Sequence, residues 1–266
     1  MKKSPLKPSL GYKLFKMIPA DLQFFYKICE TYASGYRGED NSDMRTNGEF
    51  YLALKTLKNA RVAFDVGANR GHWTQMVLSV NPSLNVHCFE PSPSTFSMLM
   101  RNHFPPNVRC NNFGLGSAEE EKELFVYSKG NGMNTLYNRG GLKARGIEDP
   151  VGREKVVLRT LESYCREKDI GDIDFVKIDT EGHEWEVIQG MGALLKEGKI
   201  KSIQFEYGPC FIDARIFLKD IFQYFEDMPY TLYKIYPRKL VRYQEYDQRL
   251  DNFQHATWAI IHDSRR

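Results

Sequence analysis

The chain has 266 residues, of which 42% are hydrophobic and 27% charged, so it can build the core of one large α/β domain or of a domain with an appendage. Its net charge of +3 is too small to indicate a polyanionic partner, and no apolar stretch approaches the roughly 20 residues of a membrane span. The five cysteines follow neither a metal-binding nor a disulfide spacing, which is typical of reduced thiols. A soluble, cytoplasmic protein is therefore expected.

Basic residues gather in two small clusters, one at the amino terminus and one near the carboxyl terminus, where Tyr236 and Tyr243 adjoin them. The clusters are Lys2, Lys3 and Lys7, and Arg238, Lys239 and Arg242. A basic and aromatic surface can serve a nucleic acid, but short charge runs are more often solvated faces. A nucleic-acid partner is therefore not expected. The sequence carries no signal for an oligomeric state.

Residues 1–59 differ in composition from the rest and are predicted to form a helical lead-in to a domain spanning residues 60–266. Prolines punctuate the start, and apolar residues then recur with helical spacing from Leu22 to Tyr32. Residues 34–47 are rich in Gly, Asp, Asn and Arg and predict a loop, either a plain connection or a cover over a site. A helix is expected at residues 48–57.

The stretch RVAFDVGANRGHW, residues 61–73, predicts a buried parallel strand that ends in a tight turn. Asp65 lies near the end of the strand, Gly67 and Gly71 bracket the turn, and helical spacing follows over residues 73–80. The turn would join the carboxyl end of a strand to the amino end of a helix. Free N–H groups and the helix dipole attract polar or anionic ligand groups there, and open α/β sheets bind nucleotides at this point.

Strand and helix signals alternate along the remainder of the chain. Strands are predicted at residues 84–90, 108–116, 156–159, 174–179, 201–207, 230–236 and 256–262, with a further strand near the margin of the sheet at 123–127. Helices are predicted at 93–102, 160–168, 187–195 and 215–225, and residues 128–154 form a long loop over the carboxyl edge of the sheet. This order predicts a doubly wound, mostly parallel, Rossmann-like α/β sheet.

Four of the predicted strands end in acidic residues: Asp65, Glu90, Asp179 and Glu206. Parallel strands would gather these carboxylates at one edge, where they need donors, cations or hydroxyl-bearing ligands. The turn at residues 67–71 lacks the third glycine of a dinucleotide fingerprint. Glu90 is placed to accept the ribose hydroxyls of either NAD or S-adenosylmethionine. Asp65 would repel a pyrophosphate but suits the ammonium group of a methionine moiety, directly or through water.

Three segments, DVGANRGHW, FEPSP and FVKIDTEGHEWEVIQG, resemble in this order the signatures of the FkbM family of S-adenosylmethionine-dependent methyltransferases, which act mostly on hydroxyl oxygens of sugars and other natural products. The resemblance covers residues 61–262 and implies a class I methyltransferase fold. It also implies that the ribose of the cofactor meets Glu90 and that the adenine lies near Asn112 and Phe113. The residues implied around the methionine portion are Asp65, Gly67, Ala68, Asn69 and Gly71.

A hydroxyl acceptor must lose a proton at or after attack on the methyl group, and the motif DTEGHE at residues 179–184 offers the candidates. Asp179 and Glu181 are the first choice, because they leave the strand nearest the expected methyl position. His183 is either catalytic or an ordinary histidine at a helix start, and Glu184 suits the first turn of a helix. Alternatively, Asp179 and Glu181 could join Glu206 in holding Mg²⁺ or Mn²⁺.

The expected function is that of an S-adenosylmethionine-dependent O-methyltransferase acting on a hydroxyl of a sugar or glycan. Met133, Asn134 and Thr135 in the long loop are candidates for contact with the acceptor. One alternative is an NAD-dependent oxidoreductase, which would use the same strand, turn and ribose carboxylate. The other is a noncatalytic cofactor-binding scaffold with residues 1–59 as its interaction surface.

Overall fold

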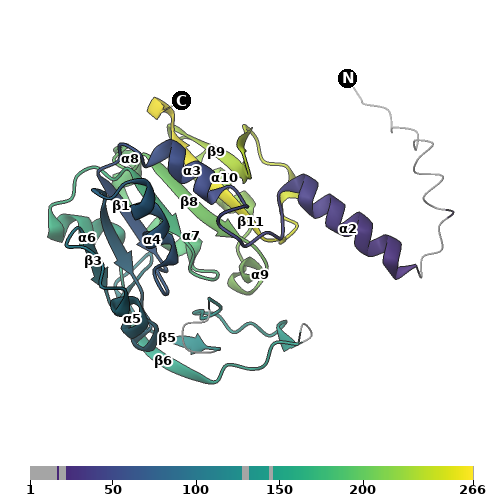
Figure 1. Cartoon of the computed structure of the whole chain (residues 1–266), viewed down its shortest axis with the longest axis horizontal. Helices are drawn as coiled ribbons and strands as arrows, with labels where there is room; N and C mark the ends of the chain where they lie inside the picture. The colour runs from purple at the N-terminus through teal and green to yellow at the C-terminus, as the bar shows by residue number, and fades with distance from the viewer. Residues whose placement is uncertain (1–16, 18–21, 128–131, 144–145, 266) are drawn as a thin grey trace.

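An eight-stranded sheet forms the body of the protein in a computed structural model that describes residues 17, 22–127, 132–143 and 146–265 (Figure 1). In spatial order its strands are β10 (Lys239–Tyr243), β9 (Tyr230–Tyr236), β11 (Ala256–His262), β8 (Ser202–Tyr207), β7 (Phe175–Ile178), β1 (Val62–Val66), β2 (Asn85–Phe89) and β3 (Val108–Asn111). The five strands from β8 to β3 are parallel, whereas β11 is antiparallel to both neighbours and β10 to β9. The predicted doubly wound, mostly parallel sheet is confirmed.

Apolar side chains of the central strands point alternately to two cores, one on each face of the sheet. Along β1, Ala63 belongs to one core, whereas Phe64 and Val66 belong to the other. The core that contains Ala63 is covered by helices α3 (Glu49–Thr56) and α4 (His72–Val80). The core that contains Phe64 and Val66 is covered by five helices: α6 (Leu161–Lys168), α7 (Glu184–Gln189), α8 (Ala193–Lys196), α9 (Cys210–Ala214) and α10 (Leu218–Phe225). Burial on both faces explains why these strands are nearly continuous apolar runs.

A second, three-stranded sheet lies beyond the end of β3, in the order β4 (Gly114–Leu115), β6 (Gly152–Arg159) and β5 (Glu120–Val126). The prediction of a strand at residues 123–127 beside the main sheet was wrong in its placement, because β5 pairs with β6 instead. Leu124, Val156 and Leu158 form the small core of this second sheet. It reaches over the carboxyl edge of the main sheet and helps to wall the cavity found there.

Several predicted boundaries differ from the structure for local reasons. The helix expected at 187–195 is divided into α7 and α8, because Gly192 has φ +49° between them. The helix expected at 215–225 begins three residues later, as α10 at Leu218, since Arg215 takes a left-handed conformation that ends the preceding helix α9, which was not predicted. Strand β10 was not predicted. Helix α5 (Pro93–Leu99) continues as a 3₁₀ turn, Met100–Asn102, and further 3₁₀ turns are Gln248–Leu250 and Asp263–Arg265.

The lead-in contains helix α2 (Gln23–Arg37), which projects away from the sheet in Figure 1. It runs four residues into the segment expected to be a loop, residues 34–37. Glu49 of α3 accepts a hydrogen bond from Gln204 of β8, so the end of the lead-in packs directly on the sheet. The division into residues 1–59 and 60–266 stays a prediction. No helix among the described residues is both long and apolar enough to cross a bilayer.

Candidate active site

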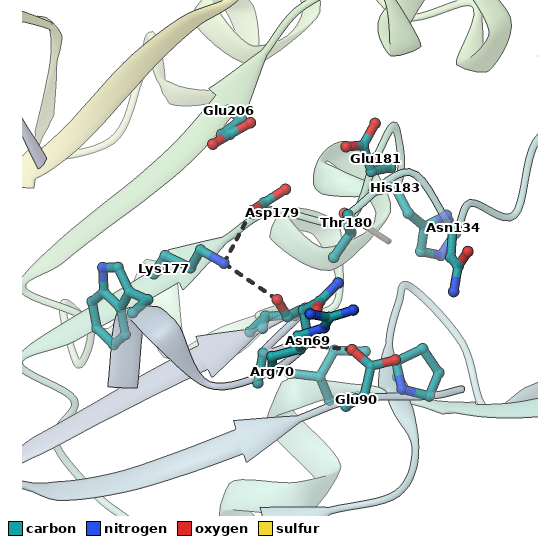
Figure 2. A pocket seen from close by; sticks show the side chains of 18 of the residues that line it. Asn69, Arg70, Glu90, Asn134, Lys177, Asp179, Thr180, Glu181, His183 and Glu206 are labelled. Atoms are coloured by element: carbon teal, nitrogen blue, oxygen red, sulfur yellow. Dashed lines mark hydrogen bonds and ion pairs between the residues drawn. The ribbon is translucent and has the colours of Figure 1, made fainter. Parts of the chain in front are cut away.

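A cavity of about 480 Å³ opens at the carboxyl ends of β1, β2, β7 and β8, where the sequence predicted a nucleotide site (Figure 2). The acidic residues that end three of these strands, Glu90, Asp179 and Glu206, all line it. Asp65 lies beneath the wall and is completely buried. The cavity is also lined by Gly67, Ala68, Asn69, Arg70, Glu181 and His183. We call this the first cavity.

The glycine turn borders the first cavity and permits a close backbone approach. Gly67 has φ +76°, and a Cβ atom there would lie 1.8 Å from the carbonyl oxygen of Asp179. Gly71 does not line the cavity; its φ of +80° lets α4 begin, and a Cβ would lie 2.7 Å from Phe104. Only glycine fits both positions without strain. The predicted tight turn is therefore present, and its two glycines serve different purposes.

Lys177, a residue not singled out from the sequence, links the carboxylates at the sheet edge. Its Nζ lies 3.4 Å from Asp65 Oδ1 and 3.2 Å from Asp179 Oδ2, and it donates to the carbonyl oxygen of Gly67. Burial opposes its charge, but Asp179 and Asp65 raise the pKa of Lys177 well above its ordinary value. Asp65 also accepts a hydrogen bond from Thr74 at 2.7 Å. Asp65 therefore acts on the first cavity through Lys177 and not by facing it.

Glu90 is fixed by the backbone on the opposite wall of the first cavity. Its Oε2 accepts a hydrogen bond from the backbone N–H of Asn69 at 2.9 Å, and its Oε1 accepts one from Ser92 at 3.0 Å. Burial raises the pKa of Glu90 to about 7 against the opposing effect of these donors. A carboxylate has about four acceptor positions, so Glu90 can still accept hydrogen bonds from ligand hydroxyls.

Asn112 and Phe113, assigned to adenine from the family resemblance, stand behind the wall of the first cavity. The Nδ2 of Asn112 donates to the carbonyl oxygen of Glu90, and Phe113 packs against Phe89 with ring centroids 5.5 Å apart. Gly114 and Leu115, the two residues that follow, form the lining instead. Their strand β4 turns back toward the cavity, an orientation that the sequence does not reveal.

Asp179 and Glu181 leave the end of β7 and carry perturbed carboxylates. Burial, together with the charge of Glu206, raises the pKa of Asp179 to about 7 despite the nearby ammonium of Lys177. Burial and Asp179 raise the pKa of Glu181 to about 8. The guanidinium of Arg139 lies 2.8 Å from Glu181 and only partly offsets these effects. Both groups are thus poised to exchange a proton near neutral pH.

His183 and Glu184 begin α7 and are both almost completely buried. Burial lowers the pKa of His183 to about 3, so its imidazole is neutral at pH 7. Its Nδ1 is hydrogen-bonded to the hydroxyl of Tyr137 at 2.9 Å, and its Nε2 has no partner among the described residues. Glu184 accepts hydrogen bonds from the backbone N–H groups of Thr180 and Gly182, as expected of a carboxylate at a helix start.

The three carboxylates proposed as metal ligands are each paired with a cationic side chain. Asp179 faces Lys177, Glu181 faces Arg139, and Glu206 lies 3.1 Å from His255 Nε2. Within the described part of the chain, no group of three or more His, Cys, Asp or Glu residues is arranged to hold a metal ion. The residues present therefore do not fit the Mg²⁺ or Mn²⁺ site that the sequence left open.

A second chamber, of about 360 Å³, adjoins the first cavity and shares Asp179, Glu181 and Glu206 with it. Its remaining wall comes from Met133 and the segment around Arg139, from residues 207–210 after β8, and from residues 253–255 before β11. The other two loop candidates lie elsewhere. Asn134 lines the first cavity, and Thr135 donates a 2.6 Å hydrogen bond to the carbonyl oxygen of Glu181.

Arg139 and His255, which were not predicted, supply the positive charge of the second chamber. The hydrogen bond that His255 donates to Glu206 raises the pKa of His255 above its ordinary value. Burial opposes ionisation of Glu206, but the bond to His255 lowers its pKa, so the two form an ion pair. Arg139 is buried, and its Nε–H donates no hydrogen bond among the described residues, although Asp213 Oδ2 lies 3.8 Å from it. Neither residue belongs to a sequence motif, so no signal pointed to it.

Left-handed backbone conformations concentrate around the two cavities. Among the described residues, seven non-glycine residues have positive φ, and three of them end helices: His103, Asp169 and Arg215. The other four line the first cavity or the second chamber: Asp40, Asn69, Glu181 and Phe253. Such conformations cost of order 1–3 kcal/mol each and cluster at functional sites. Their placement marks both cavities as one functional region.

Comparison with known proteins identifies the family. The sequence model of the family described as "Methyltransferase FkbM domain" matches residues 65–232. The hexuronic acid methyltransferase AglP of Haloferax volcanii is 29% identical over 160 residues, which are 59% of this chain and 61% of AglP. Methyltransferase 1 of Beauveria bassiana is 28% identical over 143 residues, 48% of this chain and 57% of the relative. The matches thus span less than two thirds of these relatives.

One further curated relative and one solved structure are also similar to this chain. The 2-O-methyltransferase NoeI of Sinorhizobium fredii is 25% identical over 172 residues, 60% of this chain and 68% of NoeI. The crystal structure of methyltransferase FkbM from Methylobacillus flagellatus KT aligns with 90% of this chain and 70% of its own, at 14% identity and a TM-score of 0.47. The oxidoreductase alternative is not favoured, because the family matched is one of methyltransferases. The chain belongs to the methyltransferase FkbM domain family.

Proposed function

We propose that the protein is an S-adenosylmethionine-dependent O-methyltransferase that acts on a hydroxyl group of a sugar or glycan. One observation carries the proposal: Asp179 lies on the wall that the first cavity and the second chamber share. The first cavity has the glycine turn and ribose-type carboxylate of a nucleotide site. A proton acceptor with a pKa of about 7 therefore stands between a cofactor site and a separate acceptor site.

The residues that line the first cavity are chemically suited to bind S-adenosylmethionine. Glu90 has acceptor positions left for two ribose hydroxyls, and the backbone of residues 67–70 lies close enough for direct contact. Asp65 and Asp179 share one ammonium, that of Lys177, while Glu206 is paired with His255, so ionised Asp179 leaves negative charge for a cationic ligand. When bound, S-adenosylmethionine supplies an electrophilic methyl group on a sulfonium ion.

The chain's own contribution to the reaction is alignment and removal of a proton. Holding an acceptor hydroxyl in line with the methyl group is worth ~7 kcal/mol or more. Asp179 would accept the hydroxyl proton, and Lys177 would keep its carboxylate oriented at 3.2 Å. Glu181 is held away by Arg139 and is the second choice for the base. His183 would position Tyr137 and the loop that carries it, since its Nδ1 is already hydrogen-bonded.

The charge of the second chamber favours an uncharged acceptor. Carboxylates outnumber cations on its wall: Asp40, Asp179, Glu181, Glu184 and Glu206 face only Arg139 and His255. An acidic sugar would bring a further negative charge into this setting, whereas neutral hydroxyls can donate hydrogen bonds to the carboxylates. Phe253, which stacks on buried Tyr207 with ring centroids 5.8 Å apart, offers apolar surface for a sugar ring.

Transfer of a labelled methyl group from S-adenosylmethionine to a panel of neutral glycosides, uronic acids, small alcohols and nucleic acids tests the proposal. We expect label in neutral glycosides and little in the matched uronic acids. EDTA should have no effect on the transfer, because each carboxylate of the supposed metal site has a cationic partner. Binding of S-adenosylhomocysteine without label in any fraction would instead favour the noncatalytic scaffold. Binding of NADH in its place would favour the oxidoreductase.

A further inference from the structure

Helix α2 presents large apolar side chains to solvent along its whole length. None of its 15 residues is buried. Phe24 is 71% exposed, Tyr32 73% and Tyr36 76%, and Phe25 and Ile28 are each about half exposed. Single exposed apolar residues are common on protein surfaces, but five on one helix form an apolar patch of the kind that marks an interaction site.

The apolar side chains of α2 share one face. At 100° per residue, Phe25, Ile28, Tyr32 and Tyr36 follow the spacing i, i+3, i+7, i+11 and lie within one apolar stripe. The opposite face carries the polar side chains Gln23, Lys27, Glu30 and Ser34, and Tyr26 lies beside it with its hydroxyl hydrogen-bonded to Glu30. We call the stripe formed by Phe24, Phe25, Ile28, Tyr32 and Tyr36 the aromatic face of α2.

The carboxyl end of α2 is anchored to the body of the protein. Gly38 ends the helix with φ +65°, and its backbone is so close to Tyr236 that a Cβ atom would lie 2.8 Å from the ring. Next to it, the buried carboxylate of Glu39 lies 2.8 Å from the ammonium of Lys234. Asp40 then donates its backbone N–H to the carbonyl oxygen of His255 and lines the second chamber. The aromatic face thus belongs to a helix held at the edge of the proposed acceptor site.

Positive charge is concentrated in the same part of the chain. Residues 1–37 contain seven lysines and arginines and two acidic residues, a net charge of +5, while the chain as a whole carries +3. The remaining residues therefore carry a net charge of −2. A partner of α2 should combine an apolar layer with negative charge.

A bilayer that contains anionic phospholipid fits these requirements better than a second copy of the chain. The aromatic face is about 22 Å long and about 10 Å wide, well below the roughly 800 Å² that each partner buries in a stable protein interface. Two copies would also bring two segments of charge +5 together. Phe and Tyr side chains, by contrast, suit the boundary between headgroups and acyl chains, and lysines attract anionic headgroups.

We propose that α2 is a surface anchor whose aromatic face inserts into the interface of an anionic membrane. The helix lies in the plane of the interface and does not cross the bilayer. Because Asp40 follows three residues after α2, binding would hold the second chamber near the membrane surface. The anchor itself is independent of the methyl-transfer proposal, since it uses none of the residues of the first cavity.

Sedimentation of the full chain with lipid vesicles tests the anchor. We expect roughly tenfold more protein bound to vesicles of equal parts phosphatidylcholine and phosphatidylserine than to phosphatidylcholine alone, with binding weakened by high salt. The triple variant Phe25→Ser, Ile28→Ser, Tyr32→Ser should lose this binding. The polar-face variant Gln23→Ser, which introduces the same residue type on the opposite face, should keep it.

Two control measurements distinguish a loss of membrane binding from unfolding and from a change in oligomeric state. Thermal unfolding of the triple variant should match the wild type, because none of the three side chains is buried. Light scattering should report the same mass for both. Equal binding to the two vesicle types, no binding, or binding retained by the triple variant would overturn the anchor. A wild-type dimer that the triple variant dissociates, without vesicle binding, would assign the aromatic face to a second copy instead.

Discussion

The ammonium of Lys177, in β7, lies 3.2 Å from the carboxylate of Asp179, which directly follows the strand. The same ammonium lies 3.4 Å from Asp65, which has no exposed surface. One buried cation therefore holds together the carboxylates that end two neighbouring strands. The site depends on Lys177 as much as on the acidic residues that mark it in the sequence.

Lys177→Met should destabilise the protein by about 3 kcal/mol, because it leaves buried carboxylates without their cation. Urea unfolding measures the change. Lys199→Met is the matched control: Lys199 lies 3.9 Å from Asp172 at the surface, and its loss should cost less than about 1 kcal/mol. Equal effects of the two substitutions would show that Lys177 is not central to the sheet edge.

Gly67→Ala should destabilise the protein by more than about 1 kcal/mol, because the new methyl group would meet the carbonyl of Asp179 and the backbone is left-handed. Gly152→Ala in β6 is the control, since nothing lies within 4 Å of its added Cβ. Thermal unfolding of both variants checks the difference. A Gly67→Ala protein as stable as the control would mean that the turn can rearrange.

Stability of the protein without ligand should fall as the pH rises from about 6.5 to about 8. Burial raises the pKa of Asp179 to about 7 and that of Glu181 to about 8, so the folded state holds protons that the unfolded chain has already lost. Buried His183 is neutral when folded and half protonated at about pH 6.5 when unfolded, so it opposes this trend only at the lower end of the range. Urea midpoints across this range measure it.

The double variant Asp179→Asn, Glu181→Gln should reduce the pH dependence, because neither amide titrates, and the remaining slope should come from Glu90 and Glu184, whose pKa values burial raises to about 7. The variant Glu119→Gln, at an exposed position, should leave the slope unchanged. A wild-type midpoint that rises with pH would contradict the assignment of raised pKa values to these carboxylates.

Asp179→Asn should lower turnover by roughly 10² to 10⁴ while changing affinity for S-adenosylhomocysteine only a few-fold, since the loss is that of a proton acceptor. Turnover is measured with the neutral glycoside that accepts label, and affinity by calorimetry. If Glu181→Gln had the larger effect, the base would be Glu181.

The positions of the acidic strand ends could be predicted because parallel strands bring their carboxyl ends to one edge. Asp65, Glu90, Asp179 and Glu206 were placed there on that basis alone. Lys177 carried a usable signal, a charged residue inside an apolar strand and two positions before Asp179, so that both side chains share a face. That spacing was overlooked.

Other parts of the site depend on contacts that no local pattern encodes. Arg139 and His255 reach the second chamber from segments far apart in the chain, and only tertiary folding brings them together. The short strand β4 is two residues long, too short for any periodicity, yet it sets Gly114 and Leu115 on the cavity wall where Asn112 and Phe113 were expected. Residues 128–131 and 144–145 of the long loop lie outside the described residues.

The most direct test of the account is a calorimetric titration of S-adenosylhomocysteine into the wild type, Glu90→Ala and the exposed control Glu121→Ala. We predict saturable one-to-one binding to the wild type and the control, weakened roughly tenfold in Glu90→Ala by the loss of hydrogen bonds to a charged acceptor. NADH should give no binding heat. The account would be contradicted if S-adenosylhomocysteine did not bind, or if it bound Glu90→Ala as tightly as the wild type.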